Sequence, residues 1–189
     1  MLSPHFDPFP ELATKRLRLR RLVREDASEL LFLRSDPRVM RFIAREPAKA
    51  VEEVEVFIGK VNENLKSNEA VMWAIALSAQ PSTLIGTITL WQIQRDNYRA
   101  ELGYMLHPDH WGKGLMTEAI YRVTDYGFGM LGLHSIEARA DPNNTASIRL
   151  LEKTGFIKEG YFREDYFFRG KFLDTAVYSL LAPASQPGL

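Results

Sequence analysis

The most constraining feature of this chain is a short glycine-containing loop between a strand and a helix. Residues 99–107 have the pattern of a strand that ends at Pro108, and a helix is predicted to begin at Leu115. The loop between them contains Gly112-Lys113-Gly114. Glycine lets backbone N–H groups approach an anion without a Cβ atom in the way, and a helix N-terminus adds partial positive charge there. The loop is therefore a candidate pyrophosphate cradle; a tight turn without a ligand is the alternative.

Hydrophobic periodicity predicts seven strands and four helices along the chain. The strands are expected at residues 14–22, 71–79, 84–94, 99–107, 135–140, 156–168 and 171–181, with a turn signal at 80–82. The helices are expected at residues 26–35, 47–66, 115–130 and 144–154. This order predicts an α/β fold in which a mixed, mostly antiparallel sheet of six to seven strands carries helices on both faces. In such sheets, ligands bind at the carboxyl ends of strands.

The length of 189 residues is typical of one domain. Both ends are rich in proline, which breaks the periodicity of the neighbouring segments. We therefore predict one domain over residues 11–182, with tails at 1–10 and 183–189.

Composition excludes several classes of function. Lys plus Arg and Asp plus Glu both number 24, so the net charge of zero argues against a nucleic-acid partner. Arg16, Arg18 and Arg20 alternate with leucines and are interpreted as a solvated strand face, with nucleic-acid contact as the alternative. Without cysteine there is no thiol nucleophile or thiolate metal site, and we expect no metal. The lack of a long apolar run or a signal-peptide pattern predicts a cytoplasmic protein without a membrane partner.

A second informative segment runs from Asp141 to Phe156. Asn144 has the chemistry of a helix N-cap, and Gly155 suits the position just after a helix ends. The segment thus predicts a short, well-capped helix.

Together these segments resemble the GNAT acyltransferase superfamily, specifically its ribosomal-protein N-terminal acetyltransferase branch. The resemblance implies an acetyl-CoA-dependent N-acetyltransferase, a monomer or homodimer, that transfers directly within a ternary complex. The implied acceptor is a primary amine, foremost the N-terminal α-amine of a ribosomal protein. A small amine such as a polyamine, an amino acid or an aminoglycoside is an alternative acceptor, and a non-catalytic acyl-CoA-binding protein is an alternative function. The segments that carry the resemblance are residues 16–20, 101–104, 111–114, 117–119, 144–147, 151–156 and 170–174.

By position, the superfamily's phosphate loop falls on residues 110–116. His110 replaces the usual Gln or Arg, and Met116 replaces a small residue. The resemblance further implies that main chain at residues 105–107 pairs with the pantetheine arm, that Asn144 holds the arm from the other side, and that Lys153 meets the adenosine end. The implied coenzyme-binding residues are Met105, Leu106, His107, Gly112, Lys113, Gly114, Leu115, Met116, Thr117, Asn144, Ser147 and Lys153.

Attack of an amine on a thioester needs a neutral amine. Glu101 on the central strand is the leading candidate for the general base, and Glu164 and Asp165 on the later hairpin are alternatives. Glu101 also has a purely structural interpretation, as a carboxylate on a half-exposed strand. We expect His107 and His110, which flank the loop, to serve packing or phosphate binding.

The same reaction needs a hydrogen-bond donor for the oxygen that gains charge. We expect the backbone N–H of Leu106 to supply it, where the strand splays. The resemblance places Ser147 near the coenzyme sulfur as an acid, although an ordinary first-turn residue is an equal interpretation. Tyr104 and Tyr166 are expected in the core and pocket wall. The loops around residues 36–50, 92–99 and 160–170 are expected to choose the acceptor.

Overall fold

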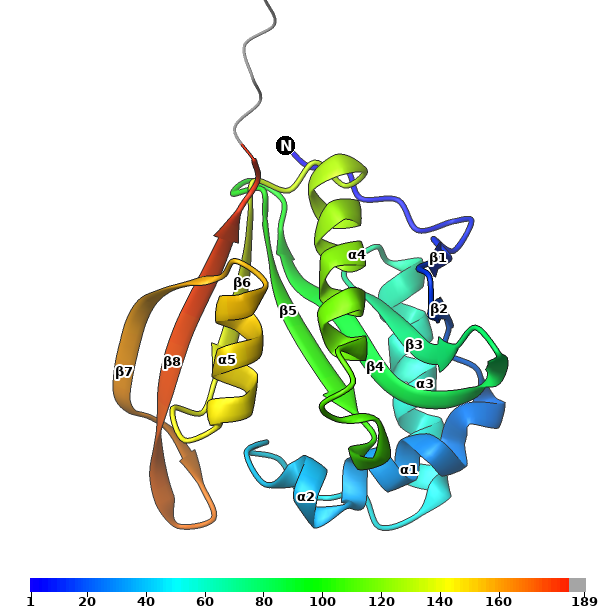
Figure 1. The fold of residues 1–189 in the computed structure, drawn as a ribbon, viewed down its shortest axis with the longest axis horizontal. Helices are drawn as coiled ribbons and strands as arrows, with labels where there is room; N and C mark the ends of the chain where they lie inside the picture. The colour runs from blue at the N-terminus through cyan, green and yellow to red at the C-terminus, as the bar shows by residue number, and fades with distance from the viewer. Residues whose placement is uncertain (184–189) are drawn as a thin grey trace, which may run out of the picture.

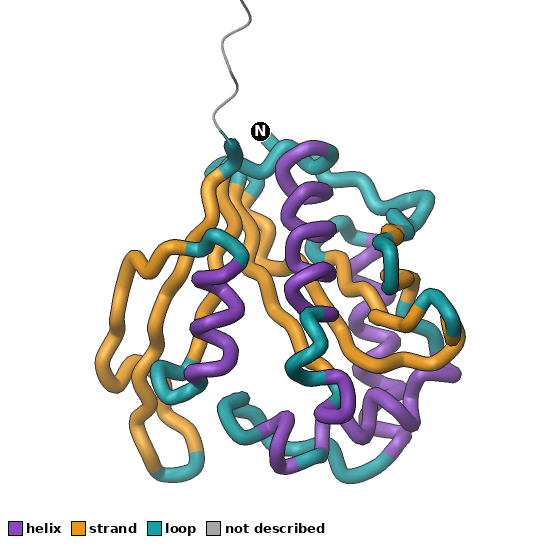
Figure 2. The backbone as a smooth tube through the Cα atoms, in the orientation of Figure 1, coloured by secondary structure: helices purple, strands orange, loops and turns teal. Residues whose placement is uncertain are grey.

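The computed structural model describes residues 1–183, whose strands form one sheet with helices on both faces (Figure 1, Figure 2). Within these residues the sheet has eight strands in the order β1-β2-β3-β4-β5-β6-β8-β7. Neighbouring strands are antiparallel except for the parallel pair β5 and β6. The predicted mixed, mostly antiparallel sheet is confirmed, and the two-residue β1 is an addition to the expected strands. The strands are β1 Leu12–Ala13, β2 Leu17–Arg21, β3 Val71–Leu77, β4 Gln80–Gln94, β5 Arg99–Leu106, β6 Ser135–Ala140, β7 Ile157–Phe168 and β8 Lys171–Leu181.

Two layers of helices bury the two faces of the sheet (Figure 1). On one face, apolar side chains of α4 and α5 join the larger core with β2, β5 and β6. On the other face, α1 and α3 form a second cluster against β3 and β4. Among the described residues, no helix combines the length and apolar character needed to cross a membrane. The helices are α1 Ala27–Ser35, α2 Pro37–Met40, α3 Val51–Lys66, α4 Leu115–Gly129 and α5 Thr145–Lys153, with 3₁₀ turns η1 Arg24–Asp26 and η2 Pro108–His110.

The N-terminal residues, expected to be a tail, pack against the core. The side chains of Leu2 and Phe6 are buried, and the Phe6 N–H donates to Asn68 Oδ1 at 2.9 Å. The indole N–H of Trp73 donates to the Pro10 carbonyl at 2.7 Å. Residues 1–10 therefore belong to the packed structure, because apolar side chains on an extended segment bury surface without regular secondary structure. Of the expected C-terminal tail, only Pro183 lies inside the described residues.

Two turns and one helix start differ from the predicted boundaries. The chain reverses at Ser78-Ala79, so the turn signal at residues 80–82 lies inside β4. Helix α3 begins at Val51, not at Pro47, and residues 41–50 form a loop instead. The short helix α2 was not predicted: Asp36 ends α1, and its carboxylate accepts from the Arg38 N–H at 2.8 Å to start a new turn.

The feature that positions the site is the divergence of the parallel pair. Strand β6 pairs with β5 only where Ser135–Glu137 face Arg99–Glu101. Beyond that point β5 stays paired with β4 up to Leu106, while β6 stays paired with β8 up to Ala140. The sheet therefore opens between the carboxyl ends of β5 and β6, which is where α/β sheets hold ligands.

Candidate active site

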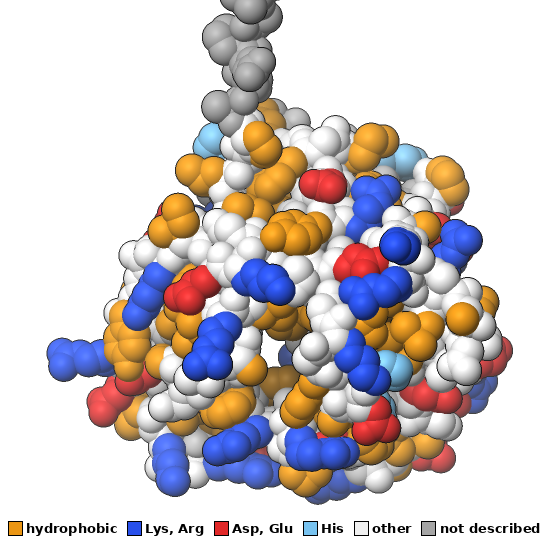
Figure 3. Space-filling model, viewed as in Figure 1, with side chains coloured by type: hydrophobic (Ala, Val, Ile, Leu, Met, Phe, Trp, Pro, Cys, Tyr) orange, Lys and Arg blue, Asp and Glu red, His pale blue; other side chains and the backbone are white. Residues whose placement is uncertain are grey.

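The opening between β5 and β6 is part of a cavity of about 810 Å³. That volume lies in the range of small-molecule and cofactor sites, roughly 300–1,000 Å³. Its walls come from β5, β6, the loop before α4, the start of α4, one side of α5, and α2 with the loop that follows it. Figure 3 shows the hollow between α4 and α5, with Lys and Arg side chains around its rim. The cavity is thus suited to a long anionic ligand.

The backbone of β5 leaves one polar edge facing this cavity. The His107 N–H donates to the Ile85 carbonyl at 2.8 Å, and Met105 pairs with Thr87 in the same ladder. Successive residues of a strand direct their N–H groups to opposite sides, so the N–H of Leu106 points away from β4. Of the predicted main-chain segment 105–107, Leu106 is therefore the residue whose N–H can meet a ligand.

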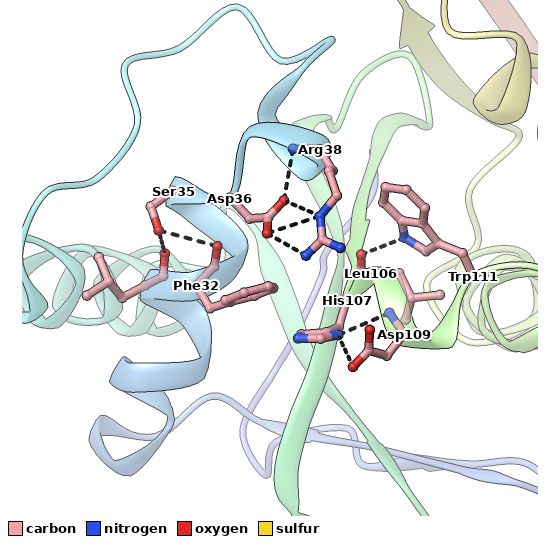
Figure 4. Close-up of polar contacts among 9 residues, drawn as sticks. Phe32, Ser35, Asp36, Arg38, Leu106, His107, Asp109 and Trp111 are labelled. Carbon is pink, nitrogen blue, oxygen red and sulfur yellow. Dashed lines mark hydrogen bonds and ion pairs between the residues drawn. The ribbon is translucent and has the colours of Figure 1, made fainter.

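Trp111 fixes the end of the same strand. Its indole N–H donates to the Leu106 carbonyl at 2.8 Å (Figure 4). His107 lies on the other side of the strand, where its ring stacks on Phe32 at 4.3 Å and its Nδ1 accepts from the Asp109 N–H at 3.2 Å (Figure 4). The His107 side chain thus packs between β5 and α1. Packing was one of the two roles expected for it, and phosphate binding was the other.

The glycine loop has the geometry of an anion cradle. Gly112 and Gly114 have φ values of 70° and 71°, in the left-handed region that favours glycine. The Glu118 N–H is the first in α4 to reach a preceding carbonyl, that of Gly114, at 3.2 Å. The N–H groups at the start of α4, from Leu115 to Thr117, have no partner within the helix and carry its partial positive charge.

The residues around this loop fit the pyrophosphate of a coenzyme. A Cβ atom on Gly112 would meet no described atom within 4 Å, so the space in front of the loop is open. Met116 lines the cavity, but most of its bulky side chain is buried in the core. Burial lowers the pKa of His110, aided by Lys113 and His107, so this residue gives little charge to a phosphate at neutral pH.

A half-buried pair of hydroxyl groups faces the cavity from two elements. The Tyr104 hydroxyl on β5 and the Ser147 Oγ in the first turn of α5 lie 2.7 Å apart. Burial raises the pKa of Tyr104 to about 12, so its hydroxyl stays protonated at neutral pH. Asn144 caps α5 as predicted, its Oδ1 accepting from the Ser147 N–H at 3.1 Å. Sequence analysis placed Tyr104 in the pocket wall and missed its contact with Ser147.

Glu101 lies at the closed end of the opening, opposite Glu137 in the last paired position of β5 and β6. Its neighbour Leu102 lines the cavity, whereas Glu101 itself projects from the other face of β5, away from α4. Burial, together with the negative charge of Glu137, raises the pKa of Glu101 to about 7. Arg99 and Arg139 lower it but form their ion pairs with Glu137.

The alternative carboxylates lie on the β7–β8 hairpin outside the cavity lining. Asp165 pairs with Arg139 at 3.0 Å, and the Glu164 N–H donates to the Asp174 carboxylate at 2.9 Å. The Asp165 carboxylate is thus held in an ion pair, whereas Glu164 is tied to the hairpin through its backbone and its side chain is exposed. Neither Glu101 nor Glu164 forms an ion pair with another described residue, and of these two only Glu101 is half-buried and has a raised pKa.

Two of the three expected acceptor loops meet at the mouth of the cavity. Phe42, from the loop after α2, lines it, and the Tyr166 hydroxyl of the hairpin donates to the Ala44 carbonyl at 3.2 Å. Arg169 of the hairpin also donates to Glu46 at 2.8 Å. The third loop, expected around residues 92–99, lies at the opposite end of β5 (Figure 1), and none of its residues lines the cavity.

A sheet that opens beside a phosphate cradle defines a protein that binds a long phosphate-bearing ligand along a strand. Residues 16–157 match the family model of the acetyltransferase (GNAT) domain. The chain therefore belongs to the GNAT family and is an acetyl-CoA-dependent N-acetyltransferase.

Three relatives show the range of proteins that this chain is similar to. The uncharacterized N-acetyltransferase p20 of Bacillus licheniformis is 38% identical, over 90% of this chain and 95% of that protein. YdaF of Bacillus subtilis, provisionally named a ribosomal N-acetyltransferase, is 33% identical over 52% of this chain and 54% of its own length. A crystal structure of the Vibrio cholerae spermidine N-acetyltransferase with CoA and spermine is 28% identical, with a TM-score of 0.79 over 89% of this chain and 97% of the other.

Proposed function

We propose that this enzyme acetylates the α-amine of a peptide N-terminus. The observation that carries the proposal is the half-buried carboxylate of Glu101, which forms no ion pair with any described residue and lies in the last paired position of β5 and β6, beside a cavity whose charged lining is mostly cationic. Such a site suits an acceptor that brings one amine and no further positive charge.

The protonation of Glu101 favours this acceptor. A general base works best when its pKa lies near the operating pH, and Glu101 has a pKa of about 7. An α-amine has an ordinary pKa of about 7.7–8.0, against about 10.4 for a lysine side chain. At pH 7 roughly one α-amine in ten is already neutral, while fewer than one lysine in a thousand is. One such carboxylate, acting directly or through a water molecule, is therefore better matched to an α-amine.

The charges around the cavity disfavour a polycation. Glu137 is paired with Arg99 and Arg139, and Asp165 is paired with Arg139, so neither is free to hold a second ammonium group. The charged side chains that line the cavity are mostly cationic. They are Arg38, Arg41, Arg139 and Lys153, against the single carboxylate of Asp141.

Three groups of this chain support the transfer itself. When bound, acetyl-CoA supplies the acetyl group as a reactive thioester. The Leu106 N–H donates to the oxygen that gains charge, which is the kind of preorganised donor that contributes most in acyl transfer. Tyr104 and Ser147 together keep a donor beside the position of the sulfur. Because a thiol has an ordinary pKa of about 8.5, this donor helps only modestly.

A small polyamine is the second candidate acceptor. The observation in its favour is the similarity to the Vibrio cholerae spermidine N-acetyltransferase over 89% of this chain.

A competition experiment separates the two acceptors. Acetylation from acetyl-CoA is followed for a peptide with a free N-terminus, for the same peptide with a blocked N-terminus and an internal lysine, and for spermidine. We expect the free N-terminus to give the highest kcat/KM. Preference for spermidine would replace our proposal with the polyamine function, and equal rates on both peptides would exclude selectivity for an α-amine. No turnover of any amine, with tight CoA binding, would point to a non-catalytic acyl-CoA-binding protein.

A further inference from the structure

We infer that Arg16, just before β2, is a positioning residue for the phosphate cradle: its guanidinium orients the Lys113–Gly114 peptide so that the N–H faces the ligand. The inference rests on coenzyme binding at the cradle and is independent of which amine is acetylated.

The contact that carries the inference joins two segments far apart in the chain. Arg16 Nη1 donates to the Lys113 carbonyl at 2.9 Å. In a trans peptide the C=O of one residue and the N–H of the next point in opposite directions. With the Lys113 carbonyl held on the Arg16 side, the N–H of Gly114 is directed away from Arg16. Gly114 lines the cavity, so this N–H joins the donors at the start of α4.

Glu118, in the first turn of α4, holds Arg16 in place. Its carboxylate accepts from Arg16 Nε at 2.7 Å and from the Arg16 backbone N–H at 2.9 Å. The Thr14 hydroxyl donates to the same carboxylate. Thr14, Arg16 and Glu118 together form what we call the cradle clamp. It connects the edge of the sheet to both the loop and the helix that supply the phosphate donors.

The clamp also neutralises a negative charge at the start of α4. A carboxylate in the first turn of α4 competes with a phosphate for the partial positive charge of the helix. The Arg16 guanidinium neutralises that carboxylate, and its Nη2 lies 3.6 Å from where a Cβ on Gly114 would stand. His110, which occupies the position of the superfamily's Gln or Arg, has a lowered pKa because of burial and gives little charge at neutral pH. Arg16 therefore offsets the Glu118 charge beside the loop, which a neutral His110 does not do.

A stability role alone does not explain this arrangement. The Arg16 side chain is 45% exposed, and exposed ion pairs add little to folding stability. Arg18, a nearby exposed residue of β2, forms no side-chain hydrogen bond or ion pair with any described residue. Comparing substitutions at Arg16 and Arg18 thus distinguishes the loss of a specific contact from the loss of one positive charge.

The test compares Arg16→Ala, Arg16→Lys and the control Arg18→Ala. CoA binding is measured by calorimetry, melting temperature by differential scanning, and turnover with acetyl-CoA and with S-acetyl-pantetheine, which lacks the pyrophosphate. We expect Arg16→Ala to raise the Kd for CoA and the KM for acetyl-CoA about tenfold, the loss of one charge-assisted hydrogen bond. Arg16→Lys is expected to bind CoA with an affinity between those of Arg16→Ala and the wild type. Lysine keeps the positive charge but lacks the guanidinium group that hydrogen-bonds both Glu118 and the Lys113 carbonyl. Arg18→Ala should match the wild type, and kcat/KM with S-acetyl-pantetheine should be unchanged in all variants.

A double variant tests whether the clamp acts as a unit. If Glu118 works by holding Arg16, then Arg16→Ala combined with Glu118→Gln should weaken CoA binding no more than the worse single variant. Three results would overturn the inference: an unchanged Kd in Arg16→Ala, an equal loss in Arg18→Ala, or an equal loss of kcat/KM with S-acetyl-pantetheine. The last result would identify Arg16 as a general structural residue.

Discussion

At the scale of single residues, the site depends on two groups whose pKa values are raised by burial in the folded protein, Glu101 and Tyr104. Glu101 shares the last paired position of β5 and β6 with Glu137, and burial keeps its carboxyl group half protonated near pH 7. Tyr104 is kept protonated by burial and touches Ser147. The structure thus offers a proton acceptor on one face of β5 and a proton donor on the other.

Glu101→Gln is expected to change both activity and stability with pH. As a base, Glu101 should make kcat/KM rise through pH 7, and its loss should lower the rate on the order of 10²-fold below pH 8. The rate of the variant should partly recover above pH 8, where solvent deprotonates an α-amine. A pH-independent loss would identify Glu101 as a positioning residue.

The same variant makes a separate prediction about folding. The pKa of Glu101 is raised from 4.5 in the unfolded chain to about 7 in the folded protein, so ionisation is costly in the folded state. The wild type should lose stability as the pH rises from about 4.5 through 7 and level off above. Urea unfolding should therefore show a larger stability gain of the Gln variant over the wild type at pH 8 than at pH 5.

Tyr104→Phe removes the hydroxyl and keeps the ring. We expect kcat to fall by roughly tenfold or less, because a thiolate is a fair leaving group unaided. CoA affinity should not change. Tyr126→Phe is the control, because Tyr126 is also buried and has a pKa raised to about 12 but lies outside the cavity lining. A Tyr104→Phe enzyme with wild-type kcat would show that the hydroxyl is a structural partner of Ser147 only.

At the scale of elements, the cradle is a strand, a loop and a helix consecutive in sequence. Pro108 ends β5, η2 turns the chain, and the positive φ of Gly114 starts α4. Each of these steps follows from a local preference of proline or glycine. The cradle is therefore the part of the site that a short segment can build by itself.

Gly114→Val is expected to weaken CoA binding more than it weakens folding. The left-handed backbone costs about 1–3 kcal/mol of stability for a residue other than glycine. Gly132→Val is a matched control, because Gly132 has φ of 72° and lies outside the cavity. Both variants should melt at similarly lowered temperatures, and only Gly114→Val should lose CoA affinity. Equal affinities would make Gly114 a structural turn.

At the scale of the whole molecule, distant segments complete the core. The N-terminal ten residues cross the edge of the sheet, where the side chains of Leu2, Pro4 and Phe6 are buried while Ser3 and His5 are exposed. This alternation is that of an extended segment. The signal was present in the sequence, but prolines masked it.

Phe6→Ala tests that packing. Truncating a buried phenylalanine costs about 3–5 kcal/mol, and the edge position of this segment favours the lower end. His5→Ala, one residue away and exposed, should leave the free energy of unfolding unchanged. The free energy of unfolding is measured by chemical denaturation. If both changes lower it by equally small amounts, residues 1–10 do not contribute to the core and are a tail.

Local chemistry in the sequence was sufficient to predict seven of the eight strands, the capped helix α5 and the glycine loop. Asn144 and Gly155 mark the ends of one helix, and Gly112 and Gly114 mark the loop, because capping and left-handed backbone depend on residues only a few positions apart. The family follows from these same local motifs, which together span most of the chain.

Tertiary structure alone decided which of these pieces meet. Tyr104 contacts Ser147 across 43 residues, and Arg16 contacts Lys113 across 97. Both contacts depend on strand order and on the side of the sheet that each helix covers. The raised pKa of Glu101 has the same origin, because burial and the neighbouring charge of Glu137 exist only once β6 lies beside β5. A periodic pattern shows that a residue is on a strand face, whereas the partner across from it is set by packing.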